Sequence, residues 1–161
     1  MDHIFLKIDD LPGSSTTTGF EAQIGLLSMS HGLSLNCFAG GGTEGRTSGV
    51  CNHNDISVTK VMDQNSVKFN EFCCNVKTIP EAVITVTRQE GEQLHPLVIY
   101  TITEVLVSSY SMSASSGGNP VETVTLNYST IKWEFTEQNT DGTVLGSVAA
   151  SWDLQKNAPA E

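Results

Sequence analysis

Alternation of apolar and polar residues with a period of two runs through most of this 161-residue sequence. Successive side chains of a β-strand point to opposite faces of its sheet, so this pattern predicts antiparallel strands with one packed and one solvated face. The longest example runs from Phe20 to Asn36, where we expect one long strand. Its apolar face would hold Leu27, Met29, Leu33 and Leu35, and its polar face Ser28, Ser30, Ser34 and Asn36.

Shorter stretches with the same alternation predict six further strands, separated by turn-forming Gly, Pro, Asn and Asp residues. They are Ile4–Ile8, Asp55–Val61, Ala82–Gln89, Leu97–Ser109, Val121–Thr136 and Val144–Trp152. One stretch has helical spacing instead: after a candidate N-cap at Ser66, apolar residues follow at Phe69, Phe72, Cys73 and Val76. The pattern therefore predicts a mainly β, antiparallel barrel or sandwich with one short helix at about residues 66–76. We expect a single domain over residues 1–161.

A glycine-rich segment interrupts this pattern between residues 39 and 49. Glycine loses more backbone freedom on folding than any other residue, so the segment predicts a long extended loop without regular structure. A loop of this kind inside a small domain is usually functional or mobile. Its central residues are Gly40, Gly41, Gly42, Thr43, Glu44, Gly45 and Arg46.

The charge balance excludes two classes of partner. Eighteen acidic residues against eight basic ones leave a net charge of −10, which repels phosphate backbones and anionic lipid. We therefore expect no nucleic acid and no membrane insertion. The N-terminus, in which Lys7 interrupts the first apolar residues, lacks the pattern of a signal peptide.

Residues able to do chemistry are scattered. Cys51 and His53 are potential metal ligands, but no second pair stands at zinc-site spacing, and no nucleophile–base motif or phosphate-binding loop is recognisable. We therefore predict no enzyme activity, no metal and no cofactor. His31 lies on the apolar side of its expected strand, which indicates a hydrogen-bonded core or interface histidine. The cysteines, Cys37, Cys51, Cys73 and Cys74, are expected to be free and mostly buried thiols.

Two tryptophans leave an alternative open. Trp133 and Trp152 fall in expected strands, where they are most simply anchors of the core or of a strand face. In a monomeric lectin-like β-sandwich, the same residues would bind carbohydrate.

Several segments, taken together and in order, resemble the Hcp (haemolysin co-regulated protein) family, the inner-tube protein of type VI secretion systems. The resemblance covers nearly the whole chain. The segments that carry it are Ile4–Ser15, Ser30 with Gly32, Asp55–Lys60 with Asp63, Glu104–Ser109, Glu122–Tyr128, and Trp152–Leu154 with Asn157. The sequence departs from the family at Met29 and His31, because an aromatic residue usually flanks the serine that matches Ser30. It also departs at Ser14, where an acidic residue is common, and at Cys51 and His53, which match no family feature.

The resemblance implies a compact β-barrel that assembles into hexameric rings, which stack into a tube. A contractile sheath fires the tube with its spike, and some family members carry small effector proteins in the ring. Ser30 matches a position that faces the lumen, with Ser28, Ser34 and Asn36 as further lining. The glycine-rich loop corresponds to an extended loop that reaches a neighbouring subunit or ring. The protein would reside in the bacterial cytoplasm and then be secreted without a signal peptide, and the chain would have no C-terminal effector extension.

Overall fold

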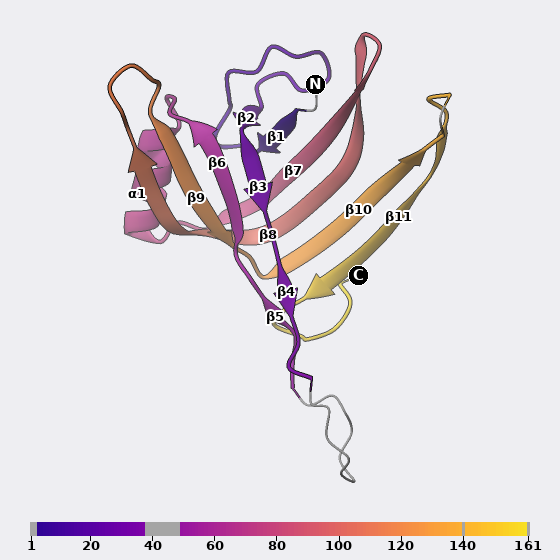
Figure 1. Ribbon diagram of the computed structural model, residues 1–161. Coiled ribbons are helices and arrows are strands. Elements are labelled where there is room, and N and C mark those ends of the chain that lie inside the picture. Colours follow the sequence, from indigo (N-terminus) through magenta and orange to yellow (C-terminus); the bar gives the residue numbers. More distant parts are fainter. Residues whose placement is uncertain (1–2, 38–48, 140, 161) are drawn as a thin grey trace.

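The structure is a computed structural model that describes residues 3–37, 49–139 and 141–160, and these residues form eleven strands and one helix (Figure 1). The first five strands are short: β1 (Ile4–Lys7), β2 (Ile24–Leu26), β3 (Ser28–Ser30), β4 (Leu33–Ser34) and β5 (Asn52–His53). The remaining elements are β6 (Ile56–Val61), α1 (Ser66–Asn75), β7 (Ile79–Glu90), β8 (Gln93–Ser113), β9 (Val121–Asn127), β10 (Thr130–Gln138) and β11 (Val144–Asp153). The described chain contains no helix long and apolar enough to cross a membrane.

The main sheet is antiparallel and curls back on itself. Its strands follow the order β2–β1–β7–β8–β9–β6–β3, so that β2 and β3 stand at its two ends. These two strands are consecutive in the chain and are joined by Leu27, whose amide donates to the Thr59 carbonyl at 2.7 Å. The two ends of the sheet therefore meet at the segment Ile24–Ser30, and the expected barrel is confirmed.

Two strands extend this barrel into a wing. The first half of β8 pairs with β10, and β10 pairs with β11, so β10 and β11 continue the sheet outward beside the β7–β8 hairpin (Figure 1). The second half of β8 pairs with β9 instead. The backbone of β8 bends between its two halves, where Glu104 has a φ of 50°.

Two predicted strands are wrong in their extent. Phe20–Asn36 is divided among β2, β3 and β4, because the chain passes from one partner strand to the next: β2 pairs with β1, β3 with β6, and β4 with β5. The predicted strand Val121–Thr136 is divided at Tyr128–Ser129, where the partner on its second edge changes from β6 to β11. The other five predicted strands are present as β1, β6, β7, β8 and β11.

The helix is present within one residue of the predicted bounds, but its N-cap residue and the burial of Val76 differ from the prediction. Asn65, and not Ser66, is the N-cap residue, since the Ser66 side chain is buried and hydrogen-bonded to the Glu122 carboxylate. Phe69 and Phe72 are buried as expected. Val76 is 68% exposed, because it ends the helix in a left-handed conformation with a φ of 56°.

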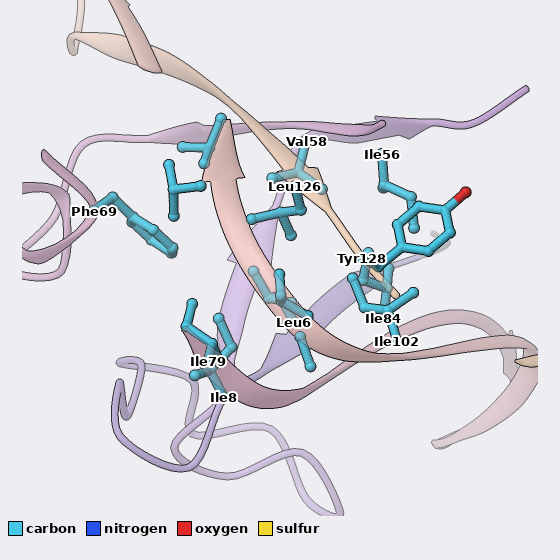
Figure 2. Close-up of a cluster of buried hydrophobic side chains, with 14 of the residues drawn as sticks. Leu6, Ile8, Ile56, Val58, Phe69, Ile79, Ile84, Ile102, Leu126 and Tyr128 are labelled. Carbon is cyan, nitrogen blue, oxygen red and sulfur yellow. The ribbon is translucent and has the colours of Figure 1, made fainter. Parts of the chain in front are cut away.

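The core fills the inside of the barrel (Figure 2). Alternate residues of six strands and Phe69 of α1 point into it and are almost completely buried; they include Leu6, Ile24, Ile56, Val58, Ile84, Ile102, Val124 and Leu126. Burial of each such side chain stabilises the folded state by about 1.5–3 kcal/mol. Since the alternation decides which side chains can be buried together, it is the main determinant of this fold.

Candidate assembly surfaces

The outer side of the barrel wall formed by β3, β6, β9 and β8 is covered by hydroxyl groups. The strand register aligns two rows of four residues, Ser28–Thr59–Thr123–Ser111 and Ser30–Ser57–Thr125–Ser109. We call these eight residues the hydroxyl face. All are exposed or half-buried, whereas the residues that alternate with them in β6 and β9 are buried. This face is therefore polar but carries no charge.

Neighbouring hydroxyls of this face bond to each other. Thr59 and Thr123 lie 3.5 Å apart, and Ser109 lies 2.6 Å from Thr125. At one end of the face, Ser108 donates to Asp55 at 2.6 Å, and the Asn127 side-chain amide donates to the same carboxylate at 2.8 Å. Cross-strand hydroxyl pairs of this kind contribute up to about 1 kcal/mol each and restrict the side chains.

A buried ion pair lies beneath the hydroxyl face. The Lys60 ammonium is 2.5 Å from the Glu122 carboxylate, and both side chains are fully buried. Lys60 also donates to Asp63 at 2.8 Å, and Glu122 accepts from Ser66 at 2.8 Å and from Tyr110 at 2.5 Å. Burial, together with this bond to Glu122, raises the pKa of the Tyr110 hydroxyl. The hydrogen bonds offset part of the desolvation cost of two buried charges.

In contrast to the polar hydroxyl face, the wing exposes an apolar surface. Two rows of side chains cross it, Tyr100–Trp133–Ala150 and Val98–Phe135–Val148. We call these six residues the apolar shelf. It continues the core row Ile102–Ile131, but Phe135 is 47% and Val148 is 73% exposed. The shelf lines a hollow of about 460 Å³.

The outer edge of the wing is a free strand edge up to Asp153, which forms a bridge with Ala158. Among the described strands, β11 pairs only with β10. Its exposed residues include Val144, Leu145 and Val148. A long exposed edge strand with apolar side chains is a template for pairing with another chain.

The β4–β5 ribbon (Leu33–Ser34 paired with Asn52–His53) extends away from the barrel (Figure 1). Leu33 and Leu35 are 47% and 44% exposed, and Leu27 is 58% exposed. Their expected packing is wrong, because a two-stranded ribbon has no covering layer and Leu27 sits at the corner between β2 and β3. Only Met29 of the predicted apolar face packs against the core.

The predicted site residues are thus distributed over different surfaces. Ser28 and Ser30 lie on the hydroxyl face, Ser34 lies in the β4–β5 ribbon, and Asn36 is exposed beyond it. The predicted contact loop lies outside the described residues; it comprises Gly40, Gly41, Gly42, Thr43, Glu44, Gly45 and Arg46.

The histidine, tryptophan and cysteine residues singled out in the sequence have structural positions rather than a shared site. His31 is hydrogen-bonded to Tyr128 at 2.7 Å, and Trp133 and Trp152 pack against the core, as anchors would. The four cysteines are free, but their expected burial is wrong. Cys37 is exposed and Cys51 is half-buried, and both lie at the ribbon. Cys74 of α1 is exposed, whereas Cys73 of α1 packs against the core and is half-buried. No group of three metal-ligating residues occurs within the described ranges.

Comparison with known proteins identifies the family of this chain. The sequence profile of the family described as "Type VI secretion system effector, Hcp" matches residues 5–135. The chain belongs to the Hcp family. It is 32% identical to the protein hcp1 of Pseudomonas aeruginosa over 159 residues, which is 98% of each chain.

Solved Hcp structures have the same fold. A type six secretion system protein superposes with a TM-score of 0.93 at 29% identity, over 99% of this chain and all of the other. Hcp1 from Salmonella typhimurium has a TM-score of 0.79 at 26% identity, over 99% of both chains. The resemblance inferred from the ordered segments is therefore confirmed.

Sequence reasoning missed two features of this Hcp chain. Lys60 and Glu122 share the inward-facing positions of their strands with core residues, and a charge at an inward position on two strands could have indicated the buried pair. The hydroxyl residues of β6, β8 and β9 were visible in the sequence as alternating Ser and Thr. Their alignment with Ser28 and Ser30 depends on strand order, which local patterns do not reveal.

Proposed function

We propose that this Hcp chain forms hexameric rings that stack into the inner tube of a type VI secretion system, with the hydroxyl face as the inner wall. The single observation that carries the proposal is that one protomer has two unlike surfaces, the hydroxyl face and the apolar shelf. A closed ring needs head-to-tail contacts in which each protomer offers a different patch on each side. The apolar shelf and the free edge of β11 supply one such patch.

The hydroxyl face has the properties that an open channel wall requires. It presents polar groups to water and so has little tendency to collapse or aggregate, and it carries no charge that would hold an ionic cargo tightly. We further propose that small effector proteins are carried against this wall before export. In this proposal the chain has a structural role and not a catalytic one, and it works with the contractile sheath and spike of the system. It acts first in the cytoplasm and is then secreted.

Native mass spectrometry of the purified chain tests the ring. We expect a species of about six times the 17.3 kDa of one chain. Negative-stain images should then contain rings with an open centre. A chain that stays monomeric at every concentration would contradict the proposal.

A further inference from the structure

Two histidines lie at the root of the β4–β5 ribbon, where it leaves the barrel. His31 precedes β4, and His53 lies in β5 opposite Leu33. Since His31 is two residues before Leu33, it takes the position diagonal to His53 across the ribbon. The Asn54 amide donates to the Gly32 carbonyl at 3.0 Å and closes the root.

Both imidazoles contact aromatic side chains of the barrel and the wing. The His31 ring meets the Tyr100 ring edge-on, with centroids 5.6 Å apart and planes at 87°, and its Nε2 is 2.7 Å from the Tyr128 hydroxyl. The His53 ring stacks on Trp133 at 6.4 Å with planes at 15° and meets Tyr128 edge-on at 6.3 Å. We call Tyr100, Tyr128 and Trp133 the aromatic seat. The ribbon root therefore rests on the seat through two titratable groups.

The hydrogen bonds at this contact suit a neutral His53, whereas the His31 bond can form in either charge state of its ring. Tyr128 donates its only hydroxyl proton to the Asn54 carbonyl at 3.1 Å, so His31 donates its Nε2–H to the Tyr128 oxygen. The His53 Nδ1 atom is buried and has no hydrogen-bond partner among the described residues. A proton added there would create a buried charged donor without an acceptor, which is costly.

Among the described residues, the surroundings offer no free carboxylate to balance two imidazolium charges. Asp55, immediately before β6, already accepts from Ser108 and Asn127. The remaining titratable groups at the root are Cys51, Tyr100 and Tyr128. Lys132 and Glu134 alternate with Trp133 along β10 and so point to its other face. Two protonated imidazoles would therefore mainly repel each other.

The direction of the titration follows from this environment. Burial lowers the pKa of both histidines from the ordinary value of 6.5, and the charge of His53 lowers the pKa of His31 further. The docked root thus binds fewer protons than the undocked root. Its stability is fully present above pH 6.5 and is lost as the pH falls from there through the lowered pKa values.

We propose that His31 and His53 form an acid-sensitive latch, in which protonation of both releases the ribbon root from the aromatic seat. The inference concerns one protomer and goes beyond the proposed ring, because it holds whether or not rings form. In an assembly it would make the position of the ribbon depend on the acidity of the surroundings.

Amide hydrogen exchange on the full chain tests the latch. Between about pH 7.5 and about pH 5, after correction for intrinsic rates, we expect protection of the Asn54 and His53 amides to fall about tenfold. The amides of Ile84 and Ile102, in the barrel, should keep their protection. Equal protection of the ribbon root at both pH values would overturn the proposal.

Matched variants identify the groups. H31Q/H53Q should keep its root protection equal at both pH values. H3Q/H95Q removes the other two histidines, which lie near the β7–β8 hairpin, and should retain the full pH dependence. If H31Q/H53Q still lost protection at low pH, the latch would lie elsewhere and the proposal would fail.

A titration of the unaltered chain by NMR gives a second measurement that needs no variant. The imidazole signals of His31 and His53 should titrate below the ordinary pKa of 6.5. The loss of root protection should follow the titration of His31 and His53. A loss with a different midpoint would contradict the latch.

Discussion

The hydroxyl face and the apolar shelf share one strand, β8, yet they are opposite in character. The second half of β8 places Ser109 and Ser111 on the outside of the barrel, where the other side of the sheet is already covered by the core. The first half places Val98 and Tyr100 on the same side as the core, but beyond the point where the barrel closes over it. The hydroxyl face is the outer side of the closed barrel. The apolar shelf is the core side of the wing, where no other layer covers it.

This difference indicates what each surface gains from a partner. Covering the shelf removes apolar area from water, which stabilises by about 25 cal/mol per Å². Covering the hydroxyl face exchanges hydrogen bonds to water for hydrogen bonds to protein, with a small net gain. The shelf is therefore suited to permanent contact between protomers, and the hydroxyl face to transient contact or to water.

The largest effect is expected from a charge on the shelf. V148D should abolish ring formation, because each interface loses about 2 kcal/mol of apolar burial and must also desolvate a carboxylate. The protomer should still fold, since Val148 is 73% exposed. Analytical ultracentrifugation should detect monomers. The matched control S147D places the same charge on the opposite face of β11 and should still form rings. If V148D formed rings and S147D did not, the assignment of the two faces would be reversed.

The next largest effect concerns the pair beneath the hydroxyl face. K60M should destabilise the chain by about 3–5 kcal/mol in urea unfolding, because it leaves the buried Glu122 without its counter-charge. K132M, on an exposed lysine, should change stability by less than about 0.5 kcal/mol. The double variant K60M/E122M should recover much of the loss, and a double variant as unstable as K60M would show that the pair does not act as a unit.

A smaller effect is expected from a charge on the hydroxyl face itself. S30E should leave rings intact, because Ser30 is exposed and far from the shelf in the strand order, but it should lower the amount of bound effector by about tenfold. Co-purification from cells that make the secretion system measures both. Unchanged effector levels would remove Ser30 from cargo binding, and loss of rings would make this face an assembly surface.

The smallest effect concerns stacking. Six chains of net charge −10 repel one another when rings approach, and salt screens this repulsion. Sedimentation should therefore detect longer stacks at higher ionic strength. Identical assembly at low and high salt would indicate that apolar contacts alone control stacking.

Particular residues mark how far sequence reasoning reached. The alternation in Ile56–Val61 and Val121–Asn127 agrees with the burial of the apolar residues of these strands, but it did not predict the burial of Lys60 and Glu122. The same alternation in Leu33 and Leu35 predicted packing that does not occur, since alternation indicates which face a residue takes and not whether anything covers that face. His53 and Trp133 are eighty residues apart in the chain, and no local pattern indicates that their rings stack.

The sequence alone determined the β class, the place of the helix and the family, because these depend on local periodicity and on ordered segments within the chain. Only the tertiary structure decided which strands became neighbours. That choice aligned eight hydroxyls into one face, left the shelf uncovered, paired Lys60 with Glu122, and brought two histidines onto one aromatic seat. The physical reason is that side-chain direction is a local property with a period of two, whereas burial depends on which distant strands close over it.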